Sequence, residues 1–144
     1  MEEPLTEELL NELLCSPNPE TYLERHPVQG RDLAAYLGEL LDECELKRKD
    51  VVREAQLNDT YGYQIFTGQR KHPSRDKILQ IAFAMGLDLR TTDRLLQAAG
   101  VSRLYCKERR DAIIMFCIDH HTSLAKVNET LFGLGEPTLD GEGR

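Results

Sequence analysis

The 144-residue sequence has only four cysteines, no tryptophan and no long apolar run. Four cysteines in a chain of this length do not indicate a disulfide framework. No apolar stretch approaches the roughly 20 residues that span a bilayer, and the acidic start, residues 1–4, is unlike a secretory signal peptide. We therefore expect a cytoplasmic protein without a membrane partner, built as one compact domain with appendages.

Motifs that carry enzyme chemistry are also missing. The sequence has no glycine-rich phosphate loop, no nucleophile elbow and no cluster of catalytic acids. Cys106, Cys117, His120 and His121 are the nearest approach to a set of metal ligands, but they lack the C-x-x-C pairs and tight spacing typical of zinc sites. We expect neither an enzyme, nor a metal site, nor a cofactor.

Basic residues are outnumbered, 18 to 25, and the formal net charge of −7 argues at first against binding to a polyanion. The imbalance is uneven, however. Residues 1–45 carry 2 basic and 12 acidic residues, residues 46–77 carry 8 and 4, and residues 78–144 carry 8 and 9. Residues 46–77 thus form a basic segment inside an acidic chain. The charge of this segment by itself is explained by a solvated helical surface. Whether the segment binds a polyanion therefore depends on the motif that it contains.

Apolar residues recur with helical spacing along most of the chain. Residues 112–118 are all apolar and suit a buried helix or strand; we predict a helix, because no segment offers the alternation of a partner strand. Cys15, Cys44 and Cys117 lie on or beside apolar stripes and are expected in the core. Predicted helices cover 6–14, 19–24, 33–44, 47–55, 58–67, a segment between Ser74 and Gly86, one ending at Gly100, 108–121, and 123–134. The fold class is all-α, and residues 135–144 should form a loose tail.

Inside the basic segment, the stretch LKRKDVVREAQLNDTYGYQIFTG (46–68) has the pattern of two short helices joined by a turn. With one helix before it and two after, the pattern resembles the helix-turn-helix domain of the phage lambda repressor and Cro family, including bacterial regulators of the xenobiotic-response-element type. The resemblance implies that Val52 takes the small apolar position of the first helix, Gln56 the turn, Leu57 the apolar position after it, and Ile65 a buried position late in the second helix. The resemblance covers about residues 31–100 and implies a domain of about five helices.

Two residues depart from that family's pattern. Gln56 occupies a turn position where glycine is usual, because the backbone there is left-handed. Gly62 stands where the family has a buried Ile or Val, and a glycine within a helix costs about 1 kcal/mol relative to alanine. Either Gly62 lets the two motif helices approach closely, or it leaves the second helix short. Residues 68–74 resemble the family's connector with one extra residue.

Polar side chains on the second motif helix suit the major groove of DNA. Gln64 can bond adenine bidentately and Asp59 can accept from cytosine N4. Either Asn58 or Asp59 can cap this helix, and for Asp59 the N-cap role is preferred over base readout. Tyr61 and Tyr63 suit packing as well as base readout. The predicted base-reading residues are Asn58, Asp59, Thr60, Tyr61, Tyr63 and Gln64. The predicted phosphate contacts, which flank that helix, are Lys47, Arg48, Lys49, Arg70, Lys71 and Arg75.

The sequence divides into an acidic extension (1–30), the helix-turn-helix domain (31–100) and a C-terminal helical extension with its tail (101–144). Apolar stripes outside 31–100 either enlarge one core or form a homodimer interface, for which the candidates are 6–14, 108–121 and 123–134. We expect a dimeric transcriptional regulator that binds double-stranded DNA in a sequence-specific way.

The alternative is a protein-interaction module on the same scaffold. Asp59, Gly62 and the acidic residues of 1–45 favour it. An acidic leader that covered the basic segment would make DNA binding autoinhibited, and deletion of residues 1–29 would then tighten it.

Overall fold

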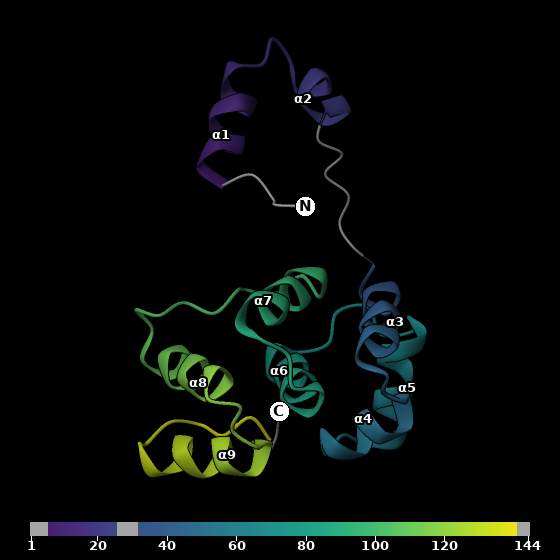
Figure 1. Cartoon of the computed structure of the whole chain (residues 1–144), viewed down its shortest axis with the longest axis vertical. Helices are drawn as coiled ribbons and strands as arrows, with labels where there is room; N and C mark the ends of the chain where they lie inside the picture. Colours follow the sequence, from purple (N-terminus) through teal and green to yellow (C-terminus); the bar gives the residue numbers. More distant parts are fainter. Residues whose placement is uncertain (1–5, 26–31, 141–144) are drawn as a thin grey trace. The chain divides into compact units, whose positions relative to one another are not determined.

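The computed structural model describes residues 6–25 and 32–140, and within them the chain forms nine helices and no strand (Figure 1). The predicted all-α class is confirmed. None of these helices is long and apolar enough to cross a bilayer. The chain divides into two compact units, Met1–Gly30 and Arg31–Arg144, called here the N-terminal unit and the main unit.

The described part of the N-terminal unit consists of α1 (Thr6–Cys15) and α2 (Pro19–Arg25). The start of α2 follows from its sequence, because the side-chain oxygen of Asn18 accepts a hydrogen bond from the backbone N–H of Thr21 at 2.9 Å. Pro19 suits the first helical position, where no backbone donor is needed.

This unit has little interior. Tyr22 is buried, whereas three leucines of α1 are exposed, namely Leu10, Leu13 and Leu14. Cys15 is also exposed, so its predicted place in a core is wrong. Two short helices contain too few side chains to enclose an apolar stripe.

The main unit contains α3 (Leu33–Cys44), α4 (Arg48–Glu54), α5 (Asp59–Thr67), α6 (Arg75–Met85), α7 (Leu89–Ala98), α8 (Arg109–Asp119) and α9 (Leu124–Gly133). These bounds agree closely with the predicted helices. The glycine stops are confirmed as well, since Gly68 and Gly86 follow α5 and α6 with positive φ values of 88° and 68°.

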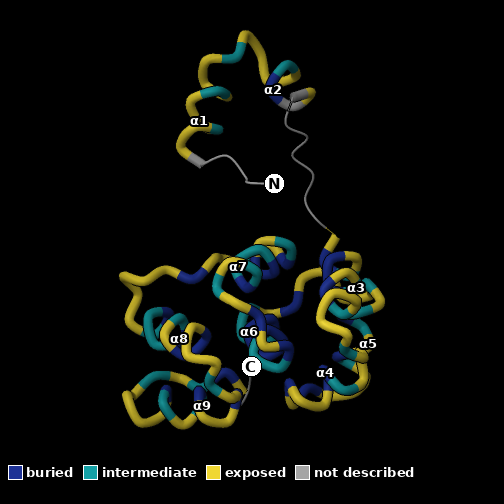
Figure 2. The backbone as a smooth tube through the Cα atoms, viewed as in Figure 1, coloured by how far each residue is buried: buried dark blue, intermediate teal, exposed yellow. Residues whose placement is uncertain are grey.

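One hydrophobic core runs through the main unit (Figure 2). Leu37 of α3, Ile65 of α5 and Leu95 of α7 are fully buried in it, and so are Ile114 of α8 and Leu131 of α9. The C-terminal helices therefore share the core of residues 31–100, and the boundary that the sequence suggests at residue 100 does not divide the structure.

The apolar run 112–118 forms the predicted helix rather than a strand. Ile114, Cys117 and Ile118 are buried, but Phe116 is 62% exposed. The helical period explains the difference, because successive residues lie about 100° apart around the axis and seven in a row cannot all face one core.

Three further predictions about burial are wrong. Cys44, the last residue of α3, is exposed, and the chain turns directly after it at Glu45, whose φ is 56°. Leu134, at the end of the predicted apolar helix 123–134, lies just beyond α9 and is exposed. The predicted loose tail is instead anchored: Leu139 is fully buried, and its backbone N–H donates to the Asn128 side chain at 2.8 Å. Residues 141–144 of that tail lie outside the described residues.

Candidate nucleic-acid interface

The turn between α4 and α5 is left-handed at Gln56, whose φ is 60°. Ala55 and Leu57 on either side are buried. A hydrogen bond from α6 holds the turn in place, because the buried side chain of Gln80 donates to the Ala55 carbonyl at 2.8 Å. Gln56 therefore adopts the strained conformation that its position in the motif predicts.

Gly62 brings α4 and α5 into close contact. It is buried, and a Cβ atom at this position would lie 2.6 Å from Cγ1 of Val52. Only hydrogen fits there, since Val52 is a branched side chain held in the core. Of the two predicted consequences of Gly62, the close approach is correct, and α5 continues undisturbed to Thr67.

Asn58 caps α5. Its side-chain oxygen accepts a hydrogen bond from the backbone N–H of Tyr61 at 3.1 Å. The N-cap role preferred for Asp59 is therefore wrong: Asp59 is the first residue of the helix, and its exposed carboxylate suits the positive end of the helix dipole.

The outward face of α5 is polar. Gly62 and Ile65 are buried against the rest of the main unit, and the opposite side is open to solvent. Of the predicted base-reading residues on the helix, Asp59, Thr60 and Tyr63 are exposed, while Tyr61 and Gln64 are half-buried. Most of the predicted set thus lies on one accessible strip.

Two arginines flank this strip and stack on its tyrosines. The guanidinium carbon of Arg48 lies 4.7 Å from the centre of the Tyr63 ring, and that of Arg70 lies 4.5 Å from the Tyr61 ring. Such cation–π contacts contribute about 0.5–1 kcal/mol at exposed sites. Both tyrosines therefore position arginines, a role that the sequence did not suggest.

Three lysines of the basic segment remain exposed. Lys47 and Lys49 lie at the start of α4, and Lys71 lies in the connector after α5. Within the described residues, none of the three forms an ion pair, whereas Arg53 pairs with Asp50 at 3.1 Å. Their charges are therefore available to an external anion.

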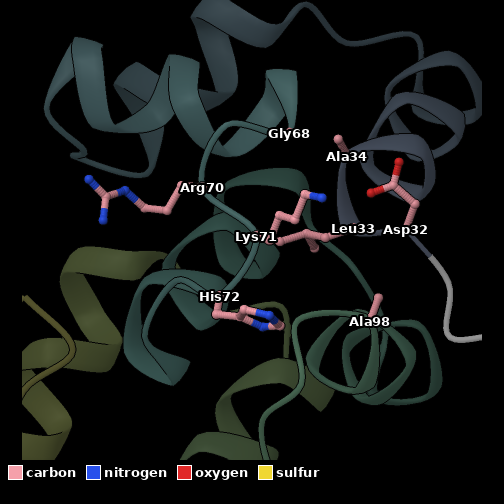
Figure 3. Close-up of a pocket in the computed structure, with 8 residues that line it drawn as sticks. All are labelled: Asp32, Leu33, Ala34, Gly68, Arg70, Lys71, His72 and Ala98. Carbon is pink, nitrogen blue, oxygen red and sulfur yellow. The ribbon is translucent and has the colours of Figure 1, made fainter.

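The connector borders a pocket at the start of α3 (Figure 3). In this view Arg70 points away from the pocket, while the Lys71 side chain extends toward the side on which Asp32 lies. The two predicted phosphate contacts of the connector therefore face different directions. The lining residues are Asp32, Leu33, Ala34, Gly68, Arg70, Lys71, His72 and Ala98.

Arg75, the last predicted phosphate contact, is bonded to residues of the protein itself. Its guanidinium donates two hydrogen bonds to the carboxylate of Asp111, at 2.8 and 2.7 Å, and two more to the carbonyls of Ser102 and Arg103. The side chains of Arg75 and Asp111 are only 23% and 7% exposed. Hydrogen bonding to Asp111 raises the pKa of Arg75 above its ordinary value. These four bonds hold the Arg75 guanidinium inside the protein, so we leave Arg75 out of the phosphate contacts proposed below.

A second ion pair mirrors the first. Arg110 donates to the carboxylate of Asp76 at 2.9 and 3.2 Å. The starts of α6 and α8 thus exchange two arginine–aspartate pairs, which we call the reciprocal ion pairs. A sequence signal exists, because Arg-Asp occurs at 75–76 and again at 110–111.

The structure does not bring Cys106, Cys117, His120 and His121 together as a set of metal ligands. Among the described residues, no group of three or more His, Cys, Asp or Glu side chains is placed to hold a metal ion. His120 instead stacks on Phe116, with ring centres 3.9 Å apart. Burial raises the pKa of the Cys117 thiol.

Comparisons with protein-family models, with curated proteins and with solved structures found no match to this chain. The functional interpretation of the α4–α5 surface therefore rests on its residues and their geometry.

Proposed function

We propose that this protein is a transcriptional regulator with a lambda-repressor-like helix-turn-helix domain, and that α5 binds the major groove of double-stranded DNA. One observation carries the proposal: the polar face of α5 is exposed between Arg48 and Arg70. The left-handed Gln56 and the close contact at Gly62 give α4 and α5 the compact arrangement that the motif requires.

Each predicted contact except Arg75 takes a definite role in this proposal. The side chains of α5 and its cap read base edges, and the flanking cations fix the register on the phosphates. The base-reading set comprises Asn58, Asp59, Thr60, Tyr61, Tyr63 and Gln64. The phosphate set comprises Lys47, Arg48, Lys49, Arg70 and Lys71.

A homodimer would place two such helices one DNA turn apart. The C-terminal helices support this part of the proposal, since Phe116 on α8, Phe132 on α9 and the adjacent Leu134 are exposed. In this role the protein acts in the cytoplasm, where bacterial DNA lies.

The test measures binding of the full chain to a pool of random-sequence duplexes by fluorescence anisotropy, over a series of salt concentrations. Arg48→Ala and Lys71→Ala should each lower the affinity and reduce the salt slope by about 0.9, the value for one phosphate contact. Lys107→Ala, at an exposed position outside both the α4–α5 surface and the candidate dimer helices, is the matched control and should change neither. Unchanged affinity and slope in both test variants would refute the proposal.

A protein-interaction module is the second candidate, and Asp59 favours it. Asp59 lines a pocket together with Arg48, Lys49, Val52 and Tyr63. A partner protein can present an acidic side chain to the two cations and a donor to Asp59, whereas a phosphate meets repulsion from the Asp59 carboxylate. A stoichiometric protein partner, together with no retention of the full chain on duplex DNA at low salt, would support this candidate.

A further inference from the structure

Arg70 and Gln64 are joined by two hydrogen bonds. The backbone N–H of Arg70 donates to the Gln64 carbonyl at 3.0 Å, and Nη2 of Arg70 donates to Oε1 of Gln64, also at 3.0 Å. The stack on Tyr61 adds a third contact. A long side chain at the surface normally rotates freely, but a ring on one face and a bond at one end fix the plane of this guanidinium.

Gly68 makes this arrangement possible. Its φ of 88° ends α5 and turns the chain back, so that a connector residue reaches the last turns of the helix. Arg70 thereby lies beside the outward face of α5 and remains exposed. It therefore extends the accessible strip of α5 by one side chain that does not belong to the helix.

The chemistry of the pair defines what it can bind. Arginine only donates hydrogen bonds, so the atom that Gln64 turns toward Arg70 is its oxygen. The amide nitrogen of Gln64 and the remaining N–H groups of Arg70 are left to bind a ligand as donors, and the Gln64 oxygen keeps only its second lone pair, so the pair presents more donors than acceptors. In the major groove, guanine presents two neighbouring acceptors, O6 and N7, whereas adenine presents an acceptor beside a donor.

We infer that Gln64 and Arg70 act as one unit that reads a guanine, with Arg70 contacting the base rather than a phosphate. This inference rests on the proposed function and sharpens it. It differs from the sequence-based expectation of adenine for Gln64, because one lone pair of the Gln64 oxygen is already bonded to Arg70 and the groups without an internal partner are mostly donors, which match the two acceptors of guanine.

The experiment is a binding selection on random duplexes with the full chain, followed by affinity measurements on the selected duplex and on one with A·T in place of the selected G·C pair. Arg70→Lys keeps the charge but loses the planar fork, and Gln64→Met keeps the length but loses the amide. Lys71→Ala is the control for a phosphate contact. Thermal unfolding of each variant verifies that it folds.

The wild-type chain should prefer the G·C duplex by about tenfold or more, within the range of one bidentate base contact. Arg70→Lys and Gln64→Met should each remove most of this preference, and Lys71→Ala should weaken binding to both duplexes equally. Selection of adenine at this position, or a guanine preference that survives both substitutions, would overturn the inference while leaving DNA binding intact. No selected motif and no binding at low salt would overturn the proposed function as well.

Discussion

Two groups of arginines in this chain have opposite surroundings. Arg48 and Arg70 stack on two tyrosines of α5, and no carboxylate forms an ion pair with either of them among the described residues. Arg75 and Arg110 face aspartates in the reciprocal ion pairs, where they join α6 to α8. The comparison teaches that a cluster of positive charge in sequence does not define a binding surface. Only the arginines whose charge faces solvent can bind an external anion.

The largest expected effect tests the internal group. Arg75→Ala should lower the free energy of unfolding by about 3 kcal/mol, because it leaves the buried Asp111 without its main partner. Chemical denaturation measures the change. Arg53→Ala is the control, since it breaks an exposed pair with Asp50 and should cost less than about 1 kcal/mol. Equal effects of the two substitutions would contradict the contrast between buried and exposed arginines.

The second prediction concerns the packing under the exposed group. Gly62→Ala should destabilise the protein by about 1–2 kcal/mol, because overpacking against Val52 outweighs the better helix propensity of alanine. Combination with Val52→Ala should reduce the penalty, and a double-mutant cycle measures this coupling. Purely additive effects would show that the two residues are not in tight contact.

A smaller and opposite effect is expected at the turn. Gln56→Gly should stabilise the protein by about 0.5–1 kcal/mol, since glycine adopts the left-handed conformation without strain. Gln97→Gly, at an exposed position within α7, should instead destabilise by about 1 kcal/mol. Thermal unfolding distinguishes the two signs, and destabilisation by Gln56→Gly would contradict the strain at this turn.

The smallest effect tests the stacked arginine directly. Tyr63→Leu removes the ring beneath Arg48 and should weaken DNA binding about two- to fivefold, in line with an exposed cation–π contact of about 0.5–1 kcal/mol. Tyr105→Leu is the control, because Tyr105 is exposed outside the α4–α5 surface. The same loss of affinity in both variants would mean that Tyr63 does not position Arg48.

The helices themselves were predictable, because their signals are local. Spacing of leucines identified α3, and the glycines at 68 and 86 marked where α5 and α6 end. The left-handed turn at Gln56 also followed from the motif. Burial of single residues did not follow. Phe116 lies inside an apolar run but on the outer side of α8, and Cys44 lies at the exposed end of α3. An apolar pattern does not say where the neighbouring helices end.

The candidate site was predictable in composition but not in its contacts. The basic segment and the polar face of α5 are visible in the sequence, yet the stacking of Arg70 on Tyr61 and its bond to Gln64 depend on a turn at Gly68 that folds the connector back. Arg75 was predicted to contact phosphate because it lies in the basic segment. Its actual partner, Asp111, lies 36 residues away along the chain, and the local sequence does not indicate this pairing.

The sequence by itself determined the all-α class, the helix bounds and the concentration of positive charge in residues 46–77, because propensity, capping and composition act between near neighbours. The tertiary structure alone decided which of those charges are available. Pairing of Arg75 with Asp111, and stacking of Arg48 and Arg70 on tyrosines, require residues of different elements to meet in space, and that meeting is set by how the helices pack around one core.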